Sequence, residues 1–225
     1  QRARRLKLAY EHIFYLVVWC AIGGFASAKI LFWITNWQEF IQNPRQIIGS
    51  DGFVVYGGII GGIFAGWLYC RIKKLKFLAY FDLMMPSIVL AQGFGRIGCF
   101  LAGCCYGKET SGPLAVTFTS SDFAPNNIPL IPTQIYSSIL DFVHFLLLLY
   151  VAKHKKADGQ VAACYLIFYS IGRFIIEFFR GDIERGSVGS FSTSQFISIF
   201  TAIAGIIVLF VATVNKKDSR NYHKK

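Results

Sequence analysis

Charged residues are scarce in this sequence. Only 16% of its 225 residues are Asp, Glu, Lys or Arg, whereas 54% are hydrophobic. A soluble domain carries about 25% charged residues, because water must solvate its surface. The mean hydropathy of +0.48 agrees with this deficit. The composition therefore excludes an ordinary soluble domain.

Amphipathic segments, which would cover apolar helices in a large soluble protein, are also missing. Instead, the chain repeats apolar runs long enough to cross a bilayer, for which a helix needs about 20 residues. These runs lie near residues 9–35, 53–70, 82–102, 132–152, 160–179 and 194–214. We predict an all-α fold, a polytopic transmembrane helix bundle with about six spans, in which residues 1–225 form a single integral membrane domain.

Long polar stretches are absent too, so there is no room for a sizeable soluble domain. The longest segment between two predicted spans, residues 103–131, contains three prolines, Pro113, Pro125 and Pro129. Proline interrupts helices. We expect residues 103–131 to form an extracytoplasmic loop, which we call the cap.

Acidic residues are few: 12 stand against 23 Lys and Arg, for a net charge of +11. Such an excess can indicate a nucleic-acid partner, but here the basic residues gather in short clusters that flank the predicted spans. These clusters lie within residues 2–7, 71–76, 153–156 and 216–225. Lys and Arg beside a span keep that flank in the cytoplasm and attract anionic lipid. We therefore expect no nucleic-acid partner, a cytoplasmic C-terminus and the cap outside.

Ionisable residues inside spans are costly, by about 2.5 to 3.5 kcal/mol each, so each needs a partner or a purpose. Arg173, Glu177 and Arg180 share one helical face in the fifth predicted span, and Arg96 lies in the outer half of the third. An Arg-Glu-Arg network that only joins helices is one reading. Glu177 can neutralise only one arginine, however, and guanidinium forks suit a phosphate. We therefore predict a site for a lipid phosphodiester.

A further acid, Asp141, falls near the middle of the fourth predicted span, one turn from His144. A hydrogen-bonded pair that faces the bundle is one reading. A proton relay or a cavity wall is the other.

Small residues at Gly58, Gly62 and Gly66 predict close helix packing in the second span. Gly57 and Gly58 lie at its outer mouth, where close approach of a ligand is an alternative to packing.

Three of the six cysteines, Cys99, Cys104 and Cys105, lie together at the outer end of the third predicted span. Outward-facing cysteines meet an oxidising compartment, so a membrane thiol-disulfide protein is an alternative function. No Cys-x-x-Cys is present, and adjacent cysteines rarely bridge without strain. Cys99 with either neighbour remains a possible bridge or metal site, but no His or acid lies at ligand spacing. We predict neither a metal nor a cofactor.

Residues 95–107, GRIGCFLAGCCYG, resemble the signature of the bacterial prolipoprotein diacylglyceryl transferases. Three further stretches are similar to motifs of that family in order and spacing, and together they extend the resemblance over nearly the whole chain. They are Tyr56-Gly57-Gly58, the PTQIY of residues 132–136 and the RFIIEFFR of residues 173–180.

The resemblance implies a transferase of the bacterial cytoplasmic (inner) membrane. Its substrates would be phosphatidylglycerol and the lipobox cysteine of a prolipoprotein signal peptide, and it would release glycerol phosphate. The family also has one span more at the N-terminus, so we expect seven spans and further residues before Gln1. The alternatives are a related phospholipid headgroup transferase with another acceptor, and a non-catalytic thiol-redox or lipid- and anion-binding membrane protein.

The resemblance also implies the site. Arginines would clamp the phosphate and stabilise the charge on the leaving group, and a base would help to form the attacking thiolate. The family's histidine is Tyr56 here, and a phenol is protonated at neutral pH, so Glu177 is the stronger candidate base. The catalytic residues would be Arg96, Arg173, Glu177 and Tyr56. The substrate-binding residues would be Arg180, Gly57, Gly58, Gly98, Cys99, Cys104, Gly107, Gln134, Tyr136 and Asp141.

Overall fold

The computed structural model describes residues 2–6, 8–50, 52–182 and 187–222, with residues from 215 onward described by backbone alone. Six helices in this part of the chain are long and apolar enough to cross a membrane, so the predicted all-α polytopic bundle is confirmed. They are α2 (Glu11–Thr35), α5 (Val55–Ile72), α6 (Phe77–Ala102), α7 (Thr133–His154), α8 (Gln160–Glu177) and α9 (Thr193–Tyr222), of which Thr193–Val214 is the apolar span.

Short elements connect these helices. They are α1 (Arg2–Arg5), α3 (Trp37–Gln42), α4 (Pro44–Gly49) and the strands β1 (Val116–Thr117), β2 (Pro129–Leu130), β3 (Ser187–Val188) and β4 (Phe191–Ser192). The chain forms two compact units, Gln1–Tyr80 and Phe81–Lys225, and each is described by itself. That both belong to a single membrane domain stays a prediction.

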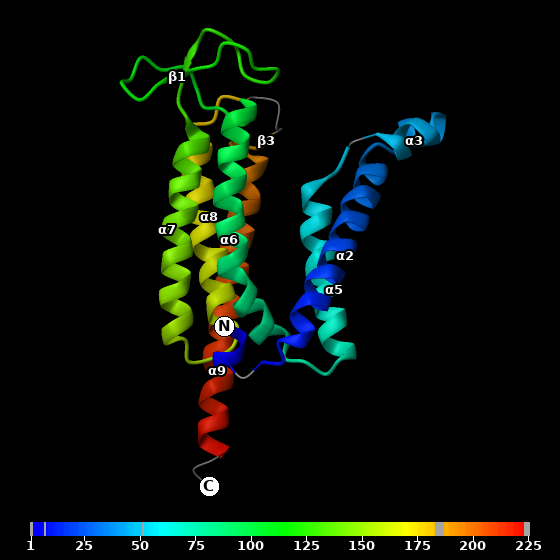
Figure 1. Ribbon diagram of the computed structural model, residues 1–225, viewed down its shortest axis with the longest axis vertical. Coiled ribbons are helices and arrows are strands. Elements are labelled where there is room, and N and C mark those ends of the chain that lie inside the picture. Colours follow the sequence, from blue (N-terminus) through cyan, green and yellow to red (C-terminus); the bar gives the residue numbers. More distant parts are fainter. Residues whose placement is uncertain (1, 7, 51, 183–186, 223–225) are drawn as a thin grey trace. The chain divides into compact units, whose positions relative to one another are not determined.

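Glycines bring α2 and α5 together in the first unit, where the two helices lie side by side (Figure 1). A Cβ on Gly57 would lie 2.6 Å from the carbonyl oxygen of Ser27, which leaves no room for a side chain. A Cβ on Gly58 would lie 3.4 Å from the carbonyl oxygen of Gly24. Packing against α2 therefore requires glycine at position 57 and leaves more room at position 58.

The second unit is a bundle of α6, α7, α8 and α9 (Figure 1). Its core contains Met85, Val89, Leu148, Val161 and Ala162. Close packing of such side chains stabilises helix contacts in lipid, where no hydrophobic effect acts between helices.

A buried acid anchors α8 to α6. Asp82 is 1% exposed and accepts hydrogen bonds from the backbone N–H groups of Gly159 and Ala162, at 2.9 Å each. Its carboxylate also pairs with Lys155 Nζ at 2.8 Å. A carboxylate at a helix N-terminus satisfies unpaired donors and complements the helix dipole. Asp82 thus fixes the start of α8.

The cap folds back onto the end of α8. Its strand β1 pairs with β2, with Val116 opposite Leu130. The backbone N–H of Lys108 donates to the carbonyl oxygen of Phe179 at 2.9 Å, and that of Gly107 donates to Ile131 at 2.9 Å. A Cβ on Gly107 would lie 2.5 Å from the Ile131 oxygen, so this close approach of three backbone segments requires glycine.

Candidate functional site

A cleft of about 290 Å³ opens between α7 and α8 in the second unit. Arg96 of α6, Asp141 of α7 and Arg173 of α8 all line it. Most of the remaining lining is apolar, including Leu140 and Ile175. Three helices therefore bring two guanidinium groups and one carboxylate to a single apolar cleft.

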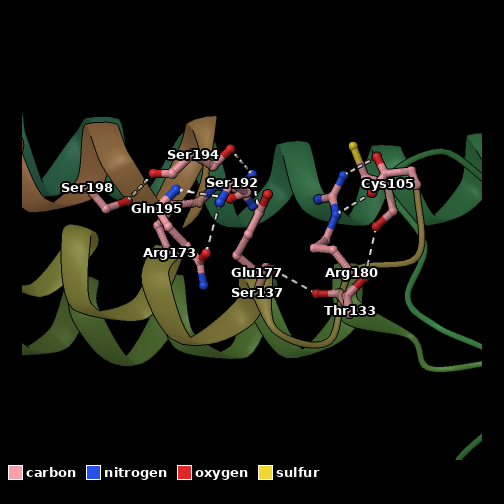
Figure 2. Close-up of polar contacts among 11 residues, drawn as sticks. Cys105, Thr133, Ser137, Arg173, Glu177, Arg180, Ser192, Ser194, Gln195 and Ser198 are labelled. Atoms are coloured by element: carbon pink, nitrogen blue, oxygen red, sulfur yellow. Dashed lines mark hydrogen bonds and ion pairs between the residues drawn. The ribbon is translucent and has the colours of Figure 1, made fainter. Parts of the chain in front are cut away.

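Arg173 is held in place from two sides. Its Nη2 atom lies 2.7 Å from Glu177 Oε2, one turn further along α8, and donates a hydrogen bond to Ser194 Oγ of α9 at 2.9 Å. The helix α8 ends at Glu177, so the expectation that Arg173, Glu177 and Arg180 share one helical face is wrong for Arg180, which lies three residues beyond the helix. Figure 2 shows Arg173 near Glu177, with Arg180 further along toward Cys105. The side chains of Arg173 and Glu177 are only 12% and 6% exposed. Their mutual pairing leaves the other guanidinium nitrogens of Arg173 for a ligand.

Arg96 has a different environment. It forms no ion pair with any residue that the structure describes in this unit. It lies within electrostatic range of both Asp141 and Arg173. Arg96 is therefore the cationic group of the cleft whose charge is least neutralised by its surroundings.

Arg180 lies outside this cleft. Its guanidinium forms a two-pronged pair with Asp182, in which Nε lies 2.7 Å from Oδ1 and Nη2 contacts Oδ2. Burial acts to lower the pKa of Arg180, but the bonds to Asp182 and Cys105 outweigh it and raise the pKa above its ordinary value. The expectation that a single acid faces three arginines is therefore wrong, because Asp182 neutralises Arg180. Arg180 instead lines a second cavity with Tyr106 and Gly107 of the cap.

Asp141 and His144 do not form the hydrogen-bonded pair that their spacing allowed. In the described part of the bundle, His144 Nε2 has no hydrogen-bond partner. The imidazole stacks on the ring of Tyr165, with centroids 5.7 Å apart and planes at 11°. Asp141 and His144 both line the cleft, which fits the alternative of a cavity wall.

The first turn of α7 fixes the segment that follows α6. Gln134 Nε2 donates to the carbonyl oxygen of Cys104 at 2.7 Å, and Thr133 Oγ1 donates to that of Cys105 at 2.8 Å. Gln134 is 1% exposed and does not line the cleft. Its role within the described structure is to position the cysteine segment.

Four other predicted binding residues, Tyr136, Cys99, Cys104 and Gly98, have different environments. Tyr136 is half-buried in α7, and Cys99 lies in the last turn of α6 beside Cys104. Burial, with a contribution from the neighbouring Cys105, raises the pKa of Cys104 to about 12, so its free thiol stays protonated. Gly98 faces open space, with no atom within 4 Å of a Cβ at that position.

Tyr56, Gly57 and Gly58 begin α5 in the first unit. Tyr56 is exposed, whereas Gly57 is buried. That these residues share a site with Arg96 and Arg173 stays a prediction.

Sequence reasoning missed Ser194, Asp182 and Asp82. Asp182 had a local signal, because it lies two residues from the arginine that it binds. Ser194 lies 21 residues from Arg173, and Asp82 lies 77 and 80 residues from the amides that it caps. Only the packing of the helices reveals these two.

Fold and site together define a multi-pass membrane protein with a basic cleft between apolar helices. A family model described as prolipoprotein diacylglyceryl transferase matches residues 1–211, and the chain belongs to this family. The family resemblance of the four motifs is thereby confirmed.

Curated bacterial relatives agree. The chain is 48% identical over 218 residues to a phosphatidylglycerol–prolipoprotein diacylglyceryl transferase of Clostridium tetani, covering 96% of this chain and 87% of the relative. It is 46% identical over 213 residues to such a transferase of Clostridium perfringens, covering 93% and 81%. A relative of the same name in Clostridioides difficile is 34% identical over 221 residues, covering 97% and 86%.

Proposed function

We propose that this protein is a transferase that moves the diacylglyceryl group of phosphatidylglycerol to the lipobox cysteine of a prolipoprotein. Family membership and the names of the relatives support this reaction. The observation that carries it is the meeting of Arg96 and Arg173 in one apolar cleft. A phosphodiester on a lipid tail is the anion that such a cleft suits best.

The arginines supply the phosphate clamp. A guanidinium has five N–H donors in a planar fork, and Arg173 spends only Nη2 on Glu177 and Ser194. Arg96, which has no ion pair within the described unit, offers its whole fork. Two forks from different helices can hold one phosphate and stabilise the charge that develops on the departing glycerol phosphate.

The apolar wall supplies the place for the acyl chains. Leu140 and Val143 of α7 and Ile171 and Ile175 of α8 line the cleft, and all four are exposed on the bundle surface. Exposed apolar side chains on transmembrane helices face lipid. A phospholipid can thus place its headgroup against the arginines while its tails remain in the bilayer.

The reaction then needs a thiolate. The sulfur of the acceptor cysteine attacks the glycerol carbon of the diacylglyceryl group, a C–S bond forms, and the C–O bond to the phosphate breaks. Glycerol phosphate leaves with the electron pair, and a base takes the thiol proton. Glu177 is engaged by Arg173, whereas Asp141 has no hydrogen-bond or ion-pair partner within the described bundle. We therefore assign the base to Asp141 in preference to Glu177 and Tyr56.

The membrane orientation follows from the basic clusters. Clusters at residues 71–76, 153–156 and 216–225 would lie in the cytoplasm, with the C-terminus, and the cap would lie outside. With this orientation, the clamp would lie in the outer half of the bacterial inner membrane. Prolipoprotein signal peptides and phosphatidylglycerol can meet there.

Reconstitution of the purified protein tests the proposal. Proteoliposomes that contain phosphatidylglycerol labelled in both its glycerol headgroup and its acyl chains are mixed with a lipobox peptide, and lipid and peptide products are identified by mass spectrometry. We expect a thioether-linked diacylglyceryl peptide and an equal amount of labelled glycerol phosphate. A matched peptide with Ser in place of the lipobox Cys should give neither product.

The other outcomes identify the alternatives. Release of glycerol phosphate with the lipid on a different acceptor would indicate another headgroup transferase. Binding of phosphatidylglycerol without turnover would indicate a lipid- or anion-binding protein. Either result would refute transfer to prolipoprotein.

A further inference from the structure

Three thiols meet at the junction of α6 and the cap. The Sγ atoms of Cys99, Cys104 and Cys105 all lie within 4.8 Å of one another, and none of these three described cysteines is in a disulfide. The other cysteines in the chain, Cys20, Cys70 and Cys164, do not belong to this cluster. We call Cys99, Cys104 and Cys105 the thiol cluster.

The backbone has an unusual conformation where it forms this cluster. The helix α6 ends at Ala102, and both Gly103, with φ +72°, and Cys105, with φ +62°, adopt the left-handed conformation. A left-handed conformation is rare for a residue other than glycine and persists where the surroundings enforce it. The backbone N–H of Cys104 donates to the carbonyl oxygen of Cys99 at 3.1 Å, so the chain turns back on the helix end.

Buried side chains hold this turn in place. The hydrogen bonds from Gln134 to Cys104 and from Thr133 to Cys105 come from two residues that are 1% and 0% exposed. Hydrogen bonds that fix the segment carrying the ligand side chains help to orient a metal site. The thiol cluster is therefore preorganised by α7 rather than assembled from a loose loop.

We propose that the thiol cluster binds a thiophilic metal ion, with Zn²⁺ as the expected occupant. At a Zn–S distance of about 2.3 Å, the sulfur ligands of a tetrahedral site lie about 3.8 Å apart, and the three Sγ atoms here all lie within 4.8 Å of one another. Thiolates select Zn²⁺ and Cu(I) over Mg²⁺ and Ca²⁺. Within the described residues, no His, Asp or Glu completes the set, so the fourth position is open to water or an exogenous ligand.

Binding releases protons. Each thiol that coordinates the ion loses its proton, so three thiols and Zn²⁺ give a tris-thiolate complex with one net negative charge. The Arg180 guanidinium interacts with Cys105 and offers a positive neighbour to this charge. No metal was expected from the sequence, because no His or acid lies at ligand spacing. Three converging thiols can hold a metal ion without such a residue.

The site would join the end of α6 to the cap. Cys99 belongs to the helix, and Cys104 and Cys105 belong to the segment that leads into the cap. An ion shared by these residues would stabilise the junction that also holds Arg180. This inference does not depend on the proposed reaction.

Metal retention tests it directly. The purified full chain, reduced and stripped with a chelator, is titrated with Zn²⁺ alone, then desalted and analysed for metal content. We expect about one equivalent of Zn²⁺ per chain and none with Mg²⁺. Thiol alkylation followed by peptide mass analysis should show Cys99, Cys104 and Cys105 protected together when Zn²⁺ is present.

Single variants provide the comparison. We expect Zn²⁺ to raise the melting temperature of the wild-type chain. Each of the variants Cys99→Ser, Cys104→Ser and Cys105→Ser should lose both tight Zn²⁺ binding and this rise. The control Cys164→Ser should keep both. Circular dichroism shows whether each variant keeps its helical content. If Zn²⁺ is retained equally by folded Cys104→Ser, or is not retained by the reduced wild-type chain, the proposal is wrong. A disulfide within the cluster that forms in air and persists in the presence of Zn²⁺ would also overturn it.

Discussion

Replacing Arg96 by Gln removes the cleft's least neutralised positive charge while keeping a side chain of similar length. Because Arg96 forms no ion pair within the described unit, its loss breaks no buried ion pair and removes only a nearby positive charge from Asp141. We therefore expect the free energy of unfolding to change by no more than about 0.5 kcal/mol, as for substitutions that break no buried pair. The effect on activity should be far larger.

The magnitude follows from the number of contacts at stake. Arg173 already gives one nitrogen to Glu177 and Ser194, so Arg96 supplies the larger share of free donors for the phosphate. Removal of one preorganised donor to a developing negative charge costs about 2.7 to 4 kcal/mol, or about 100- to 1,000-fold in rate. Arg96→Lys keeps the charge but loses the fork, so its rate should lie between those of the wild type and Arg96→Gln.

The assay is release of labelled glycerol phosphate from phosphatidylglycerol in proteoliposomes, with melting temperature measured on the same preparations. Arg71→Gln is the matched control, because Arg71 is exposed in the last turn of α5 and belongs to a predicted cytoplasmic cluster. We expect it to retain wild-type activity. If the Arg96→Gln rate lies within about threefold of the wild-type rate, the activation free energy has changed by less than about 0.7 kcal/mol. That result would refute the proposed clamp.

Three further sites test contacts within the two units. Glu177→Gln leaves the buried Arg173 without its counter-charge and should lower the free energy of unfolding by about 3 kcal/mol, measured by denaturant titration in detergent. Glu177→Asp should restore part of this stability. Unchanged stability in Glu177→Gln would contradict the ion pair. Asp82→Asn replaces a charged helix cap by an amide and should lower the free energy of unfolding by about 3 kcal/mol, and the melting temperature with it. An unaltered melting curve would argue against the anchor. Gly57→Ala should lower the free energy of unfolding by about 1 to 3 kcal/mol through overpacking, and Gly58→Ala should lower it much less. Equal effects of the two substitutions would show that the close contact with α2 is not maintained.

Hydrophobic length made the six spans predictable. Each span is a local property, since about 20 apolar residues must form a helix to satisfy their backbone in lipid. The predicted boundaries differ from the observed ones by only a few residues for most helices. The exceptions are α9, which continues to Tyr222 rather than ending near residue 214, and α6, which begins at Phe77 rather than near residue 82 and continues through Pro86. A proline was no barrier there, because neighbouring helices can compensate for the lost hydrogen bond.

The site was only partly predictable. Helical periodicity predicts Arg173, Glu177 and Arg180 on one face, but α8 ends at Glu177, and only Arg173 and Glu177 pair within the helix (Figure 2). Periodicity does not say which partner each residue chooses. Arg180 pairs with Asp182 and faces the cap cavity, whereas Arg173 turns to Glu177 and the cleft.

The sequence by itself determined that this chain is a multi-pass membrane protein, and its motifs pointed to the family. Both depend on residues that are close together along the chain. The tertiary structure decided that Arg96 and Arg173 share a cleft with Asp141, and that Ser194 of α9 braces Arg173. These contacts join different helices, and their geometry depends on helix rotation and packing, which no local pattern specifies.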